Sequence, residues 1–152
     1  MVIAQLVKTP KALLESPGFL LKRLGHLVKE KTIDAYDGRT PYAYGVLTLL
    51  DQGACQTQAT IADALGYDRS YLVGVLDELE RDGLVERRRD TTDRRRHVVT
   101  MTPTGKKELA RLRRIHESID DEFFAALSAT EQKTLTALLE KVAASQDPRY
   151  SR

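Results

Sequence analysis

The residues best suited to chemistry in this 152-residue chain are six arginines within ten positions. They flank a polar turn at 90–93 and are Arg87, Arg88, Arg89, Arg94, Arg95 and Arg96. Residues 97–101 read as a strand, and two extended arms joined by a polar turn predict a β-hairpin. Guanidinium groups are planar, permanently charged and weakly hydrated, which suits phosphate contacts and insertion into a narrow, electronegative DNA groove. The hairpin therefore indicates a nucleic-acid contact, with a solvated charged turn as the alternative.

The distribution of charge is more informative than its total. The formal net charge is only +2. Residues 87–107 carry eight Lys and Arg against two Asp, a net of +6, whereas residues 57–86 carry two basic against seven acidic residues, a net of −5. A chain that needs charge for solubility alone intersperses its signs, so this concentration favours a polyanionic partner.

Two short helices are predicted before the hairpin. The first spans 57–65 and is closed by Gly66, and the second spans 69–82 and is closed by Gly83. Apolar residues recur in the second at i, i+3, i+4 and i+7, which is typical of a helix with one buried face. They are Leu72, Val75, Leu76 and Leu79. A tight turn between two short helices predicts a helix-turn-helix, and the following hairpin makes it a winged one.

Longer helices flank this lobe. A polar cap followed by proline at 16–17, 40–41 and 102–103 predicts three helix starts, and Ser128 with Glu131 forms a capping box for a last helix. The helix from 103 carries an apolar stripe at Leu109, Leu112, Ile115, Ile119, Phe123 and Leu127. About 24 residues would span about 36 Å, which is too long for one small lobe to cover, so the stripe predicts a seam with a second chain.

Together these elements predict a mainly α fold with a small β-hairpin wing. Residues 40–102 form the winged helix-turn-helix lobe, residues 1–39 and 103–147 form a helical dimerisation layer, and residues 148–152 form a frayed tail. The chain has no run of eighteen apolar residues and no signal-peptide pattern, which predicts a cytoplasmic protein without a membrane contact.

The motifs in this order resemble the MarR family of bacterial transcriptional regulators over residues 17–143. The resemblance is carried by IADALG at 61–66, LDELERDGLVER at 76–87, DRRR at 93–96 and VTMTPTG at 99–105. It implies a homodimer in which the second short helix of each lobe enters the major groove of double-stranded DNA and the wing reaches the adjacent minor groove. It also implies, for many members, a response to a small anionic or phenolic ligand or to oxidation of a cysteine.

The helix over 69–82 supplies the predicted base contacts. Its outward candidates near the N-terminus are Arg69, Ser70, Tyr71, Val73 and Gly74. Arg69 and Ser70 suit phosphates or base edges. Where family members often carry Thr-Arg or Ser-Arg, this chain has Val73 and Gly74. Either these two permit close approach and a thymine methyl contact, or Gly74 only relieves a tight helix contact.

In the wing, the resemblance implies that Arg95 enters the minor groove, with Arg94 and Arg96 directed towards phosphates or Asp93. We expect Asp93 to hold the turn in shape. Alternate side chains of a strand face opposite ways, so only one or two of the arginines at 87–89 can reach DNA, and Arg88 is included as a candidate.

An effector pocket is predicted where the long helices meet the lobe. Its candidate lining residues are His26, Tyr36, Tyr44 and His116. The alternative is that the histidines are satisfied or solvated. Cys55, the only cysteine, excludes an intrachain disulfide and lies just before a helix start, where a thiol can become reactive; a passive cysteine is the alternative.

No catalytic motif, metal-ligand cluster or cofactor-binding loop is recognisable, so we predict no enzyme, no metal and no cofactor. The expected function is a dimeric, sequence-specific DNA-binding regulator that represses a pseudo-palindromic operator and is relieved by a small molecule. The alternatives are a winged-helix module that binds an acidic protein and a cysteine-based redox sensor.

Overall fold

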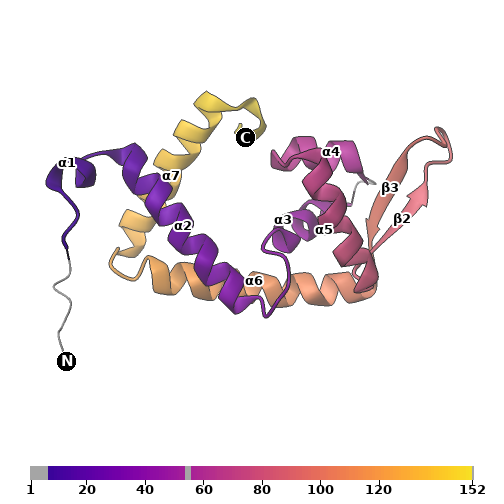
Figure 1. Cartoon of the computed structure of the whole chain (residues 1–152), viewed down its shortest axis with the longest axis horizontal. Helices are drawn as coiled ribbons and strands as arrows, with labels where there is room; N and C mark the ends of the chain where they lie inside the picture. The colour runs from indigo at the N-terminus through magenta and orange to yellow at the C-terminus, as the bar shows by residue number, and fades with distance from the viewer. Residues whose placement is uncertain (1–6, 54–55, 152) are drawn as a thin grey trace.

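The computed structural model describes residues 7–53 and 56–151, and Figure 1 shows their arrangement. The elements in chain order are α1 (Lys11–Leu14), α2 (Pro17–Ala35), α3 (Ala43–Asp51), β1 (Gln56–Thr57), α4 (Gln58–Leu65), α5 (Arg69–Arg81), β2 (Val85–Arg89), β3 (His97–Met101), α6 (Pro103–Phe123), α7 (Ala129–Gln146) and the 3₁₀ helix η1 (Pro148–Tyr150). The long α6 joins two parts, with α2 and α7 towards one end and α3, α4, α5 and the β2–β3 hairpin towards the other (Figure 1). The predicted mainly α fold with a winged helix-turn-helix is confirmed.

The wing is a three-stranded antiparallel sheet in the order β1-β3-β2. In β2 and β3, Val85 lies opposite Met101 and Arg87 lies opposite Val99. The strand β1 was not predicted, because two residues are too short to show an alternating pattern. It pairs Gln56 with Val99 and so attaches the start of α4 to the base of the wing.

The hydrophobic core lies inside the winged lobe and extends onto α6. Its fully buried members come from every helix of the lobe and include the four predicted apolar residues of α5. They include Ala43, Val46, Leu47, Ile61, Ala62, Leu72, Val75, Leu76, Leu79, Val85, Val99, Leu109 and Leu112. Burying one face of α5 in this core leaves its opposite face in solvent.

The start of α3 differs from the prediction. Thr40 and Pro41 do not begin the helix, which starts at Ala43. The Thr40 backbone N–H donates to Glu78 Oε1 on α5 at 2.9 Å, and the Ala43 N–H donates to the Thr40 carbonyl at 3.1 Å. The connection over 36–42 is thereby held against α5 as a turn, and the helix begins after it.

Two predictions for the C-terminal region are also wrong. The helix α6 ends at Phe123, so Leu127 lies in the turn before α7 rather than on the α6 stripe. The tail is not frayed over 148–150, since Pro148–Tyr150 form a 3₁₀ helix. The guanidinium of Arg149 donates to the carbonyl of Asp63 on α4 at 2.5 Å and so holds the tail against the lobe.

The flanking helices leave apolar side chains in solvent. No residue of α7 is buried in the single chain. Exposed large apolar residues gather on α1, α2 and α7, namely Leu13, Leu14, Leu21, Leu24, Ile33, Leu138, Leu139 and Val142. Among the described residues, no helix combines the length and the apolar character needed to cross a bilayer.

Candidate DNA interface

The solvent-facing side of α5 is formed by the predicted residues. With Leu72, Leu76 and Leu79 buried, the helical repeat of 100° per residue places Ser70 and Gly74 at the centre of the opposite face. Tyr71 and Val73 flank this centre, with 49% and 41% of their surface exposed. The structure thus brings the candidates of the helix together on one face.

The N-terminus of α5 is fixed by a side-chain cap. Asp68 accepts a hydrogen bond from the Tyr71 backbone N–H at 3.0 Å, and Gly66 precedes it in the left-handed region at φ 68°. This positive φ favours glycine and makes the turn between α4 and α5 tight. Arg69 follows the cap with an exposed side chain whose contacts to Asp63 are long, at 3.4 Å. Its guanidinium is therefore accessible to an anion.

The acidic residues of α5 are bound by the protein's own donors. Glu80 accepts from the Arg87 guanidinium at 2.5 Å and from its backbone N–H at 3.1 Å, and Asp77 lies 2.6 Å from the same guanidinium. Hydrogen bonds to Arg87 hold the pKa of Glu80 below its usual value, and the pairing raises the pKa of Arg87. Both carboxylates next to the outward face are thereby paired with one guanidinium, and the three groups together keep a single negative charge.

The C-terminal half of α5 is tied to the connection between α2 and α3. Glu78 binds the Thr40 N–H, and Asp82 pairs with Arg39 at 2.9 Å. The mostly buried Arg39 also pairs with Glu108 on α6 at 2.7 Å. Four of the seven acids over 57–86 are thus engaged within the protein and anchor the helix.

The tip of the wing is shaped by two aspartates. Asp90 accepts from the Thr92 N–H at 2.8 Å, and Asp93 accepts from the Arg95 N–H at 3.0 Å. The Asp93 carbonyl accepts from the Arg96 N–H, and the Arg96 carbonyl from the Asp90 N–H, both at 2.9 Å. The backbone at 90–96 is therefore closed on itself, and the side chains of its arginines point to solvent.

The arginines of the wing differ in how free they are. The side chain of Arg95 is 93% exposed and its contact to Asp93 is long, at 3.4 Å, and Arg96 has a still longer contact of 3.6 Å to the same carboxylate. Arg88 pairs with Glu86 at 2.7 Å. Over the described parts of the chain, the exposed Arg89 and Arg94 make no side-chain ion pair with an acid. Sequence reasoning did not single out Arg89, since strand alternation alone does not tell which arginine finds an internal partner.

A hollow of about 390 Å³ lies between the wing and the start of α4. It is lined by Thr57, Gln58, Ala59, Thr60, Arg95, Arg96 and His97. Thr57 caps α4 by accepting from the Thr60 N–H at 3.1 Å. The start of a helix and two arginines thus line one space, an arrangement that attracts anionic oxygens.

Comparison with known proteins agrees with this geometry. Residues 40–97 match the model of the MarR family. A protein of Thauera aromatica, named as a transcriptional regulatory protein for the hcr operon, is 38% identical over 112 residues, which are 74% of this chain and 68% of that protein. The chain belongs to the MarR family.

Solved structures extend the comparison over nearly the whole MarR-family chain. The transcriptional repressor CouR of Rhodococcus jostii RHA1, bound to a 23-mer DNA duplex, is 31% identical with a TM-score of 0.81, covering 91% of this chain and 99% of CouR. Bordetella bronchiseptica BpsR, whose DNA binding is regulated by 6-hydroxynicotinic acid, is 25% identical with a TM-score of 0.77, covering 89% and 98%. As a MarR-family transcriptional regulator, the protein binds DNA and is not an enzyme.

Three of the four predicted effector residues meet where the MarR-family lobe joins α2 and α6. The hydroxyl of the buried Tyr36 lies 2.5 Å from His116 Nε2, and the Tyr44 ring stacks on His116 with centroids 4.1 Å apart. Burial raises the pKa of Tyr36 and lowers the pKa of His116. His26 does not join them, because it lies ten residues before Tyr36 along α2, where it pairs with Glu30 at 3.2 Å in solvent.

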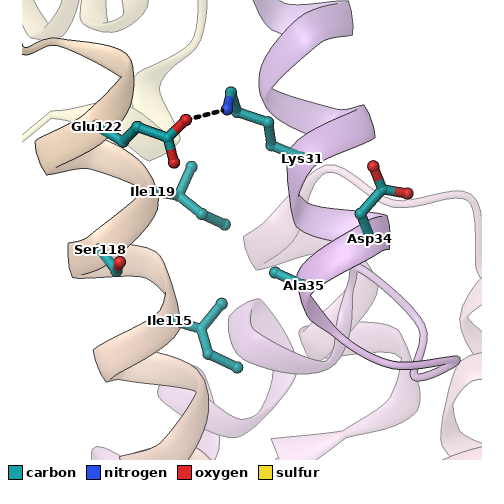
Figure 2. A pocket seen from close by; sticks show the side chains of 7 residues that line it. All are labelled: Lys31, Asp34, Ala35, Ile115, Ser118, Ile119 and Glu122. Carbon is teal, nitrogen blue, oxygen red and sulfur yellow. Dashed lines mark hydrogen bonds and ion pairs between the residues drawn. The ribbon is translucent and has the colours of Figure 1, made fainter.

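A separate groove of about 460 Å³ lies between α2 and α6 (Figure 2). It is lined by Lys31, Asp34, Ala35, Ile115, Ser118, Ile119 and Glu122. Lys31 and Glu122 form an ion pair of 2.6 Å across it. None of the four predicted effector residues lines this groove, and the predicted redox residue, Cys55, lies outside the described residues.

Proposed function

We propose that this MarR-family regulator acts as a homodimer that represses transcription from a pseudo-palindromic operator in the cytoplasm. The observation that carries the dimer is the apolar surface left uncovered on α1, α2 and α7. Exposed apolar patches of this kind mark an interaction site, and the residues come from the same terminal helices that flank the lobe. Within the layer over 1–39 and 103–147, the proposed interface is formed by α1, α2 and α7. The predicted seam along the α6 stripe is not supported, because Leu109, Leu112 and Ile119 are buried within the single chain.

In a dimer with two-fold symmetry, the distance between the two lobes would set the spacing of the half-sites in the DNA. The two copies of α5 would enter successive major grooves, so half-sites about 10 bp apart from centre to centre are expected. Arg95 would enter the minor groove beside each half-site, while Arg88, Arg94 and Arg96 lie along the phosphates. The hollow between α4 and the wing would take one phosphate of the backbone.

A small anionic or phenolic effector would relieve repression. Tyr36, Tyr44 and His116 come from three elements that join the lobe to the terminal helices, so a ligand that separates them would reorient the lobe. The regulation of BpsR by 6-hydroxynicotinic acid, an aromatic acid, supports this ligand class. Tyr36, Tyr44 and His116 would be coupled to α5 through the connection over 36–42. In this connection, the Thr40 N–H donates to Glu78 and Arg39 pairs with Asp82.

Selection of binding duplexes from sheared genomic DNA, followed by in vitro transcription from the bound promoters, tests the proposal. We expect enrichment of inverted repeats and less transcript in the presence of the protein. Addition of aromatic acids should restore transcript. Enrichment of direct or single sites, or unchanged transcript, would contradict it.

A further inference from the structure

Over residues 70–77, the centre of the α5 outward face lacks the side chains that read base edges through paired hydrogen bonds. Bidentate readout of guanine or adenine uses Arg, Lys, Asn or Gln. Here the central positions are Ser70 and Gly74, and the next outward residue, Asp77, is paired with Arg87. Among these three, only the Ser70 hydroxyl is left to make a base-specific hydrogen bond.

Apolar groups occupy the flanks of the same face. Tyr71 and Val73 are two of the large apolar side chains that the structure leaves exposed, and both lie on α5. Between them, a Cβ added at Gly74 would meet nothing within 4 Å. Gly74 therefore relieves no contact within the chain, and its missing side chain leaves room on the outside of the helix.

The ring of Tyr71 is held in place by other aromatic rings. It meets Tyr42 edge-on at 4.9 Å, and Tyr42 meets Tyr67 edge-on at 5.0 Å. Tyr67 in turn lies against α3, where its hydroxyl is 2.8 Å from the place a Cβ of Gly45 would take. This row of three rings fixes Tyr71 to the core of the lobe and makes it a rigid wall of the outward face.

We propose that α5 reads thymine by its C5-methyl group, with Val73 as the contacting side chain, Tyr71 as the opposite wall and Gly74 as the gap that lets the base edge approach. In the major groove, the thymine methyl is the apolar feature of the base edges. The inference rests on the proposed entry of α5 into that groove. The contact between Val73 and the thymine methyl would determine specificity without a bidentate hydrogen bond.

The test uses duplexes enriched by the full-length protein from a random pool. Each thymine is replaced singly by deoxyuridine, which removes one methyl group and nothing else. We expect one or two positions in each half-site to lose affinity about fourfold, the factor for one buried methyl-sized group. Val73→Ala should bind the thymine and uracil duplexes equally, while retaining the salt dependence of the wild type.

A second variant, Gly74→Ala, tests the gap on the outward face without destabilising the fold. Alanine favours a helix over glycine and meets no neighbour here, so the variant should unfold at a higher temperature than the wild type. Its DNA affinity should nevertheless fall several-fold because the gap is filled. Full affinity of Gly74→Ala, or uracil tolerance at every position, would overturn the inference while leaving the proposed function intact. If the wild type enriched no duplex, both would fail.

Discussion

Replacement of Arg87 by Ala should destabilise the fold, although the residue belongs to the arginine-rich wing. Its guanidinium is 20% exposed and binds Asp77 and Glu80 at 2.6 and 2.5 Å. A charge-assisted hydrogen bond contributes about 1.5–3 kcal/mol when desolvated, but both carboxylates are more than a third exposed and can be rehydrated. We therefore expect a loss of about 1–2 kcal/mol, or a decrease of roughly 2–8 °C in Tm for a chain of this size.

The pH dependence of this difference provides an internal check. The folded pKa of Glu80 lies below its ordinary value of 4.5, so the interaction stabilises the fold above that value and is lost as the pH falls through the folded pKa. Thermal unfolding at equal protein concentration should show the gap between wild type and Arg87→Ala at pH 7 and its closure in acid.

The neighbouring Arg89→Ala is the matched control, since Arg89 has no partner in the described structure and should change stability by less than about 0.5 kcal/mol. Equal Tm shifts for the two variants, or a gap that persists unchanged in acid, would refute the assignment of Arg87 to an internal ion pair.

Three further predictions concern the wing, a helix packing contact and the partly buried His116. Arg95→Ala removes two charges per dimer, so it should lower DNA affinity and reduce the slope of log K against log salt by about 1.8, measured by fluorescence anisotropy; an unchanged slope would place Arg95 away from DNA. Gly105→Ala should cost about 1–3 kcal/mol in urea unfolding, because the added Cβ would lie 2.1 Å from the Leu84 carbonyl oxygen, whereas Gly18→Ala meets nothing within 4 Å and should not. The His116 ring should titrate below 6.5 by NMR because it is partly buried; the unfolded chain then binds more protons, so stability should fall as the pH drops through 6.5, and an ordinary titration would contradict the burial.

Elements defined by local signals were predictable from the sequence. The helices α4 and α5 follow from a cap at Thr57, a left-handed glycine at 66 and an apolar repeat, all within a few residues of the features they specify. The wing follows from its turn and from the strand after it. The outward residues of α5 follow from the same repeat, because burial of one face fixes the other.

Features defined by distant partners could not be predicted. Arg39 and Glu108 are 69 residues apart, and nothing in either local sequence indicates that they meet. Arg87 looks like its neighbours in the sequence, and only the packing of β2 on α5 separates it from the solvent-exposed arginines of the wing. His26 was grouped with His116 because the two long helices were expected to meet beside the lobe, yet His26 lies ten residues before Tyr36, which amounts to about 15 Å along a helix.

Hydroxyl-radical footprinting of the wild-type protein on an enriched duplex tests the central claim most directly. Two recognition helices and two arginine-tipped wings related by a two-fold axis should protect a symmetric pattern, with two half-sites about 10 bp apart and minor-groove protection beside each. Protection of a single half-site, or an asymmetric pattern without minor-groove contacts, would contradict the account.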